Sequence, residues 1–164
     1  MRSIPGRHET GLKPPPVSIA AVVLVLDSIM ALLLETVWGD IVMDLEDSIL
    51  SENLLKLTKA GFYQRQLIHL IRNNLAFTGC PRGVGTGGTC IFGLLDNEYY
   101  EKSTKQFIKS GGHERKETYE KGDVVACLTT SVDDTIGSQF AIAIGPVTGE
   151  DCFYIGKVAE DFSH

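Results

Sequence analysis

The hydrophobic pattern between Ala31 and Leu45 alternates at every second residue, which is typical of half-buried β-strands. Leu32 and Leu34 share one parity, and the parity breaks around the segment Trp38-Gly39-Asp40. A break of this kind at a glycine is typical of two strands joined by a tight turn. The sequence therefore predicts a β-hairpin over residues 31–45.

One amphipathic helix is predicted after this hairpin, roughly from Ile49 to Ala60. Asp47 or Ser48 can cap its first turn, and Gly61 offers a C-terminal stop. The apolar residues that recur at helical spacing along this segment are Leu50, Leu54 and Leu57.

Short apolar runs separated by long glycine-rich and polar loops make up the rest of the chain. This pattern predicts a mainly β fold, an antiparallel barrel or sandwich with a helix at its mouth. We interpret the charged stretch from Glu114 to Lys121 as a solvated loop. The runs expected to form strands are Leu67–Ile71, Val124–Leu128, Phe140–Ile144 and Phe153–Val158.

Residues 1–29 differ from the rest because they hold four of the six prolines, followed by the apolar run Ile19–Leu26. That run is too short for a membrane span, which needs about 20 residues. A signal peptide fits loosely, since basic residues precede the run. We favour an appended leader or a wrongly assigned gene start, with a disordered tail as the alternative. The expected division is a leader over 1–29 and one domain over 30–164.

The composition, with 43% hydrophobic and 22% charged residues among 164, is typical of a single globular domain. A net charge of -6 argues against a nucleic-acid surface on this segment. No C-x-x-C pair and no histidine at zinc spacing accompany the cysteines, so we expect no metal site and reduced thiols, as in a nuclear or cytoplasmic protein. The four cysteines are Cys80, Cys90, Cys127 and Cys152.

Three motifs have a chemical interpretation that we reject. The segment Gly83–Gly88 satisfies G-x-G-x-x-G, but no helical spacing follows it, so we expect an irregular loop that brings backbone close to a ligand. Asp133-Asp134 lacks a third ligand at calcium-loop spacing and is interpreted as an exposed loop. Cys80 and His69 lack a group to orient the histidine for thiol catalysis.

Four stretches of the chain, in the right order, resemble the cyclophilins. The start at Met30 and the segment Thr78-Gly79-Cys80-Pro81 are most similar to the nuclear branch of that family, whose isomerase domain is followed by an RNA-recognition domain. The four stretches are Thr36–Val42, Glu52–Leu57 with Gly61-Phe62-Tyr63, Gly85–Gly88 with Ile91-Phe92-Gly93, and Gly137–Phe140.

The resemblance implies an antiparallel β-barrel closed at its ends by helices, which binds X-Pro segments of proteins in a surface groove. It implies a peptidyl-prolyl cis-trans isomerase of protein folding that needs no cofactor, with proline-containing peptide segments as partners and neither nucleic acid nor membrane bound by this segment. The uncatalysed rotation has a barrier of about 18–20 kcal/mol. Preferential binding of the twisted amide lowers that barrier.

The groove residues of the family can be placed on this sequence one at a time. The catalytic Arg falls on Leu70, which cannot donate a hydrogen bond, and Arg72 lies close enough to replace it if the short segment after His69 changes register. Gln139 matches the family. We therefore take Gln139 and Arg72 as candidate catalytic residues. The candidate substrate-binding residues are His69, Leu75, Gly87, Gly88, Thr129, Thr130, Phe140 and Ala141.

These departures predict a divergent domain with weak isomerase activity, or alternatively a non-catalytic peptide-binding or scaffold module in a nuclear RNA-processing assembly. We also expect the domain to be truncated after His164, where the family adds a last helix and a strand that pairs with the first. A truncated product that does not fold is a third possibility. An edge left unpaired beside residues 31–37 would invite association, and Ile19–Leu26 is a candidate to cover it.

Overall fold

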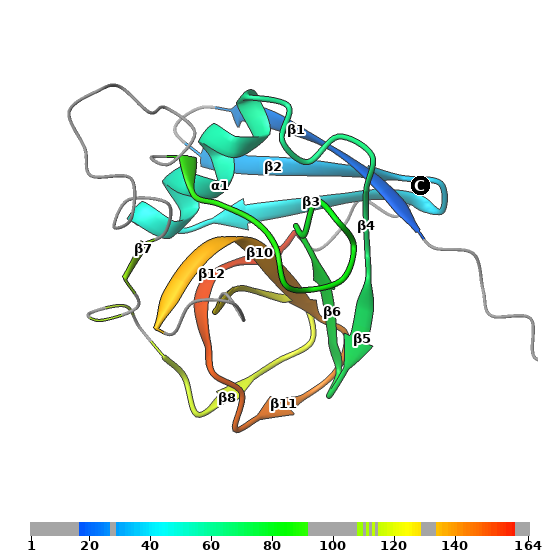
Figure 1. Cartoon of the computed structure of the whole chain (residues 1–164). Coiled ribbons are helices and arrows are strands. Elements are labelled where there is room, and N and C mark those ends of the chain that lie inside the picture. Colours follow the sequence, from blue (N-terminus) through cyan, green and yellow to red (C-terminus); the bar gives the residue numbers. More distant parts are fainter. Residues whose placement is uncertain are drawn as a thin grey trace, which may run out of the picture.

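The fold is given by a computed structural model that describes residues 17–26, 29–91, 108–109, 111, 113, 115–128 and 134–159. It is mainly β, as predicted (Figure 1). Ten strands form one antiparallel sheet in the order β4-β1-β2-β3-β12-β9-β10-β6-β5, with β7 paired to β10. The strands of this sheet are β1 (Ser18–Leu26), β2 (Ile29–Thr36), β3 (Gly39–Leu45), β4 (Gln66–Leu67), β5 (Leu70–Arg72), β6 (Leu75–Thr78), β7 (Ile108–Lys109), β9 (Asp123–Leu128), β10 (Thr135–Ala143) and β12 (Cys152–Val158).

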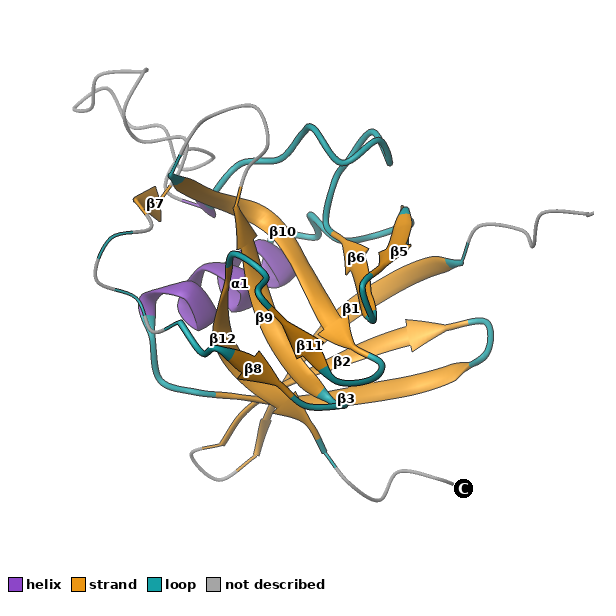
Figure 2. Ribbon diagram, turned by 90° about the horizontal axis from the view of Figure 1, so that it is seen from below, coloured by secondary structure: helices purple, strands orange, loops and turns teal. Residues whose placement is uncertain are grey.

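The sheet is curled, with the helix on one side and a small second sheet on the other (Figures 1 and 2). Strands β8 (Thr118–Tyr119) and β11 (Val147–Thr148) form that second sheet. The prediction of a solvated loop over residues 114–121 was therefore wrong in part. Strand β8 lies within that stretch, and Tyr119 is only 2% exposed. A tyrosine ring among the charges drives this short strand inward, because burying an aromatic side chain is strongly favourable.

The helix α1 (Ile49–Lys59) agrees with its prediction within one residue. Ser48 is the N-cap, and its Oγ accepts the N–H of Ser51 at 3.1 Å. Gly61 ends the helix in the left-handed region at φ 75°, where glycine carries no steric penalty. No helix in the described residues is long and apolar enough to cross a membrane.

The central strands are buried on both faces, which explains their continuous apolar runs. Alternate residues of β9, β10 and β12 enter two clusters. One face, with Val124, Phe140 and Phe153, packs toward α1. The opposite face forms a second cluster that contains Leu75, Tyr119, Val125, Cys127, Ala141, Ala143, Val147 and Cys152.

The hairpin predicted over residues 31–45 is present as β2 and β3, and its turn is Val37-Trp38, with Thr36 opposite Gly39. Thr36 Oγ1 donates to the carbonyl of Gly39 at 2.7 Å and fixes the turn. The edge of β2 is covered by β1 along its whole length, from Ile19 opposite Thr36 to Leu26 opposite Ile29. The hypothesis that the run Ile19–Leu26 covers this edge is thus confirmed.

Residues 18–26 of the expected leader are therefore part of the sheet. Ile19 is 2% exposed and belongs to the main core. Strand β1 also pairs with β4, where Ser18 lies opposite Leu67. The division of the chain into 1–29 and 30–164 stays a prediction.

Candidate functional site

A groove with a volume of about 380 Å³ lies on the face of the sheet opposite α1. Its walls come from segments far apart in the sequence. The hairpin β5–β6, the loop over residues 83–86, the ends of β9 and β10, and residues 150–152 all line it. Four of the ten predicted site residues line this groove, namely His69, Arg72, Leu75 and Gln139.

The hairpin β5–β6 presents four alternate side chains to the groove. Leu70 pairs with Phe77, and Arg72 pairs with Leu75, so these residues share one face of the two strands. The guanidinium Cζ of Arg72 lies 5.8 Å from the centre of the Phe77 ring, within cation–π range. Leu75 is 1% exposed and forms part of the floor. The tight turn needs φ values of 49° at Asn73 and 61° at Asn74, which asparagine tolerates well.

Gln139 ties β10 to the glycine loop on the groove wall. Its Nε2 donates to the carbonyls of Gly85 at 2.9 Å and Gly87 at 2.8 Å. Both amide protons are thereby used, and Oε1 is the atom of this side chain that could accept a further hydrogen bond. The amide thus organises the loop whose residues 84–86 line the groove.

The strand around Gln139 is held from behind by a buried polar network. The pairing of β9 and β10 shifts register between Ile136 and Phe140, so this part of β10 departs from the regular ladder. Its backbone carbonyls find side-chain donors instead. Asn53 Nδ2 donates to Gly137 at 2.9 Å, and Tyr63 Oη donates to Ser138 at 2.8 Å.

The loop packs on this strand through two glycines. A Cβ on Gly79 would lie 2.2 Å from the carbonyl oxygen of Ser138, and one on Gly88 would lie 2.3 Å from Ser138 Oγ. Ser138 Oγ itself donates to the carbonyl of Gly79 at 2.7 Å. Only glycine fits at both positions, and Gly88 thereby gives a physical role to the glycine-rich motif. The segment is an irregular loop, as predicted.

His69 lines the groove beside Gly85, since a Cβ on that glycine would lie 3.4 Å from His69 Nε2. Burial lowers the pKa of His69, and the carbonyl of Leu67 opposes part of this shift. The buried Nδ1 has no hydrogen-bond partner among the described residues. The neutral imidazole is therefore favoured, because a buried group carries a charge only at a cost.

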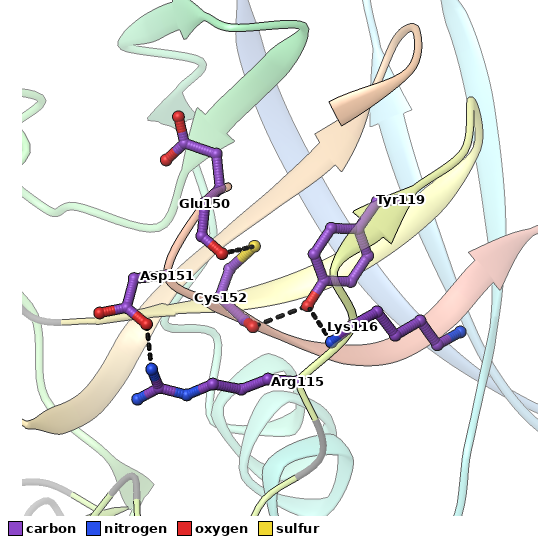
Figure 3. Close-up of polar contacts among 6 residues, drawn as sticks. All are labelled: Arg115, Lys116, Tyr119, Glu150, Asp151 and Cys152. Carbon is purple, nitrogen blue, oxygen red and sulfur yellow. Dashed lines mark hydrogen bonds and ion pairs between the residues drawn. The ribbon is translucent and has the colours of Figure 1, made fainter. Parts of the chain in front are cut away.

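Residues 150–152, at the start of β12, form another part of the groove wall, and Figure 3 shows their polar contacts. Asp151 forms an ion pair with Arg115, whose Cζ lies 4.7 Å from the centre of the Phe153 ring. Tyr119 Oη donates to the carbonyl of Cys152 at 2.7 Å. Burial raises the pKa of the Tyr119 hydroxyl to about 12, so it stays a donor at neutral pH. These contacts fix the backbone of Cys152, a residue that lines the groove.

The other predicted site residues lie elsewhere or outside the described residues. Phe140 packs its ring edge-on against Tyr63 in the core, with centroids 5.6 Å apart. Ala141 is buried in the second cluster beneath the groove. Gly87 and Gly88 meet Gln139 and Ser138 as described above. The last two predicted substrate-binding residues, Thr129 and Thr130, lie outside the described residues.

Sequence reasoning missed the acidic residues Glu150 and Asp151, which also line the groove. No periodicity marks them, because they precede β12 in an irregular segment. Glu150 accepts a hydrogen bond from Asn73 Nδ2 in the β5–β6 turn, which no local pattern announces. Sequence reasoning also missed Val84, which is 63% exposed and lines the groove, because it lies within the glycine motif.

The thiol of Cys80 lies against the glycine loop, and the N–H of Gly87 donates to its Sγ at 3.3 Å. Burial would raise the pKa of this thiol, but the N–H groups of the loop outweigh burial and lower it. No group of three or more residues suited to hold a metal ion occurs in the part of the chain that the structure describes.

Both the sequence and the fold of this chain are similar to those of known proteins. Residues 31–164 match the family described as cyclophilin type peptidyl-prolyl cis-trans isomerase/CLD. The chain belongs to the cyclophilin family. Its fold is similar to that of a cyclophilin type peptidyl-prolyl cis-trans isomerase of Cryptosporidium parvum, determined in the presence of the dipeptide Ala-Pro. That match has a TM-score of 0.60, 20% identity, and covers 90% of this chain and 80% of the other.

Two similar relatives are named peptidyl-prolyl cis-trans isomerase-like 4. The one from Gibberella zeae is 36% identical over 149 residues, which cover 81% of this chain and 30% of that protein. The one from Homo sapiens is 36% identical over 136 residues, which cover 79% of this cyclophilin chain and 25% of the relative. The chain thus spans less than a third of the length of these relatives.

Proposed function

We propose that the groove binds X-Pro segments of proteins and accelerates their cis/trans isomerisation, with weak activity. The observation that carries this proposal is the convergence of Arg72, Leu75 and Gln139 on one groove. An apolar floor with a cation and an amide at its walls has the composition that a prolyl ring and its flanking amides require.

In this proposal the ring of the substrate proline packs on the floor near Leu75 and Phe77. Arg72, on the same face of the hairpin, donates a hydrogen bond to the prolyl nitrogen as the amide twists and its lone pair becomes available. Gln139 positions the loop residues Gly85 and Gly87 that flank the peptide. Catalysis follows from tighter binding of the twisted amide than of either planar isomer.

The position of Arg72 sets the expected strength of catalysis. A hydrogen bond to a charged group contributes about 1.5–3 kcal/mol, and about 1.4 kcal/mol corresponds to a tenfold change in rate. Leu70, at the position that the resemblance assigns to the catalytic Arg, lines the groove but offers no donor. Arg72 must therefore supply this interaction from two residues further along β5.

Exchange NMR on an Ala-Pro peptide with the full chain tests the proposal. The full chain is required because β1 pairs with β2. We expect accelerated exchange, and a decrease of about 10- to 100-fold in the Arg72→Ala variant. Arg72→Lys should recover part of the activity. Arg65→Ala is the matched control, since Arg65 is exposed and lies outside the groove.

The outcomes separate the parts of this proposal. A folded wild-type chain that binds the peptide without accelerating exchange would refute isomerisation. An active chain whose Arg72→Ala variant keeps full activity would refute the role of Arg72 alone.

A non-catalytic peptide-binding module is the second candidate, and the presence of Leu70 in place of a donor favours it. This candidate predicts that the Ala-Pro peptide shifts the amide signals of groove residues while exchange stays at the uncatalysed rate. It fits a scaffold in a nuclear RNA-processing assembly.

We further propose that the chain comes from the divergent nuclear branch whose isomerase domain precedes an RNA-recognition domain. The start at Met30 and the segment Thr78–Pro81, which resemble that branch, support the assignment. Its location is then nuclear or cytoplasmic, and proline-containing peptide segments, rather than nucleic acid, are the partners of this segment. Staining of the tagged full-length protein with an antibody tests the location.

A further inference from the structure

Two cysteines lie directly opposite each other beneath the groove. Cys127 is in β9 and Cys152 is in β12, and the register of these antiparallel strands pairs one with the other. Both thiols are free and buried. Directly opposed residues in an antiparallel pair have Cα atoms about 4.5 or 5.5 Å apart, within the about 4.4–6.8 Å that a disulfide spans.

The two side chains also point to the same side of the sheet. Both belong to the cluster that packs between the central strands and β8, and both line the groove. Opposed Cβ atoms on one face are about 4.5–5.5 Å apart, whereas a disulfide needs about 3.5–4.5 Å. The two Cβ atoms must therefore approach each other by about 0.7–1.7 Å to reach the mean disulfide spacing of about 3.8 Å.

The surroundings hold Cys152 in this register (Figure 3). The carbonyl of Cys152 accepts the hydrogen bond of Tyr119, and the preceding Asp151 is tied to Arg115. On the other strand, Val125 and Ala126 stay paired with Tyr154 and Phe153. Neither sulfur needs the strands to separate in order to meet the other.

From this juxtaposition we propose that Cys127 and Cys152 form a reversible disulfide across the floor of the groove when the protein meets hydrogen peroxide. One thiolate attacks a peroxide oxygen, which gives a sulfenic acid on that sulfur and releases hydroxide. The other thiolate then attacks the sulfenic sulfur, forms the S–S bond and displaces a second hydroxide. Two thiols lose two electrons and two protons, and the peroxide is reduced to two waters.

The groove gives a small oxidant access to this pair and not to the other cysteines. Cys80 and Cys90 are 1% and 0% exposed and do not line the groove. Burial raises the pKa of Cys127 well above its usual value and that of Cys152 to about 11. A thiol with a raised pKa forms little thiolate and therefore reacts slowly. The disulfide it forms is also harder to reduce, because the reduced form is not stabilised as a thiolate. The bond should therefore form slowly and persist.

Peptide mapping of the peroxide-treated full chain tests this proposal without any substitution. Remaining thiols are blocked before proteolysis without reductant, and we expect a linked peptide pair containing Cys127 and Cys152 that dithiothreitol separates. In the Cys152→Ser variant this pair must be absent, and Cys127 should carry a sulfenic acid or a higher oxide. A chain unfolded in urea during oxidation is the control, and its four cysteines should link without preference.

Two results would overturn the inference. One is a folded, oxidised chain in which Cys127 and Cys152 remain unlinked, and the other is a folded chain with the same mixture of pairs as the unfolded control. A second readout tests the link to the groove: the amide signals of Leu75 and Gln139 should shift on oxidation and return on reduction. Peptide masses report whether the disulfide forms, and they do not depend on isomerase activity. A missing disulfide is therefore distinguishable from a failure of the proposed isomerase function.

Discussion

A single amide, that of Gln139, connects the chemistry of this groove to its architecture. The side chain is 6% exposed, and its two hydrogen bonds to Gly85 and Gly87 bring together segments more than fifty residues apart. A hydrogen-bond donor matters most through what its removal leaves unpaired. A fully buried carbonyl without a partner costs about 1–3 kcal/mol, and the hydrogen bonds to Gly85 and Gly87 are part-buried. Gln139 therefore positions the loop as well as facing the groove.

Gln139→Ala should lower the free energy of unfolding by about 1–3 kcal/mol, since two loop carbonyls lose their donor. Gln139→Glu keeps the size of the side chain but sets a carboxylate against the same two carbonyls, so it should be at least as destabilising at neutral pH. Urea unfolding of both variants measures this effect. Stability equal to wild type in both would show that the loop does not depend on the amide.

His69 should make stability depend on pH in a defined window. Burial lowers its pKa in the folded chain, so the unfolded chain binds more protons. The free energy of unfolding should therefore fall as pH drops below about 6.5, the ordinary pKa, and level off below the lowered folded pKa. Urea unfolding between pH 5 and 7.5, compared with His69→Gln, isolates this contribution. A wild-type curve parallel to that of the variant would refute it.

At the scale of elements, β1 covers the edge of β2. The resemblance assigns the place beside the first family strand to a strand from the C-terminal end of the domain. Here the apolar run Ile19–Leu26 pairs along the whole of β2 instead. An exposed edge would present unpaired N–H and C=O groups to other chains. Strand β1 removes that liability from β2 and adds Ile19 to the core, and β4 in turn pairs with the outer side of β1 at Ser18 and Ile19.

Deletion of residues 1–28 should therefore destabilise the fold by at least about 2 kcal/mol, from the lost burial of Ile19 alone, and should promote association. Deletion of residues 1–16 is the matched control, because it leaves β1 in place. Hydrogen exchange on the amides of β2, with sedimentation to follow association, measures both effects. Equal protection of β2 in the two deletions would contradict this role of β1.

The elements that sequence could predict are those with a strong local period. The hairpin β2–β3 and the helix α1 follow from alternation, helical spacing and a serine cap. The short strand β8 could not be predicted, because its charged neighbours conceal the buried Tyr119. The buried ring also depends on a partner for its hydroxyl, the carbonyl of Cys152, which lies 33 residues away. Local sequence patterns do not show contacts between residues so far apart in the chain.

On the scale of the whole molecule, the groove exists only when the curled sheet is complete. The hairpin β5–β6, the glycine loop, β9, β10 and the segment before β12 each supply part of its lining. The sequence placed His69, Leu75 and Gln139 near one site through the family pattern. Glu150 and the meeting of Cys127 with Cys152 depend on strand order and register, which single-sequence patterns do not specify.

A groove assembled in this way couples ligand binding to global stability. A ligand that binds only the folded chain raises the free energy of unfolding by about 2.7 kcal/mol at a concentration of 100 Kd. An Ala-Pro peptide should therefore raise the urea midpoint of the full chain with the logarithm of its concentration above Kd, whereas an Ala-Ala peptide at the same concentration should not. The Arg72→Ala variant should keep part of this stabilisation, because Leu75 and the rest of the apolar floor remain. Equal stabilisation by both peptides would mean that the groove does not recognise proline, whether or not the chain is an isomerase.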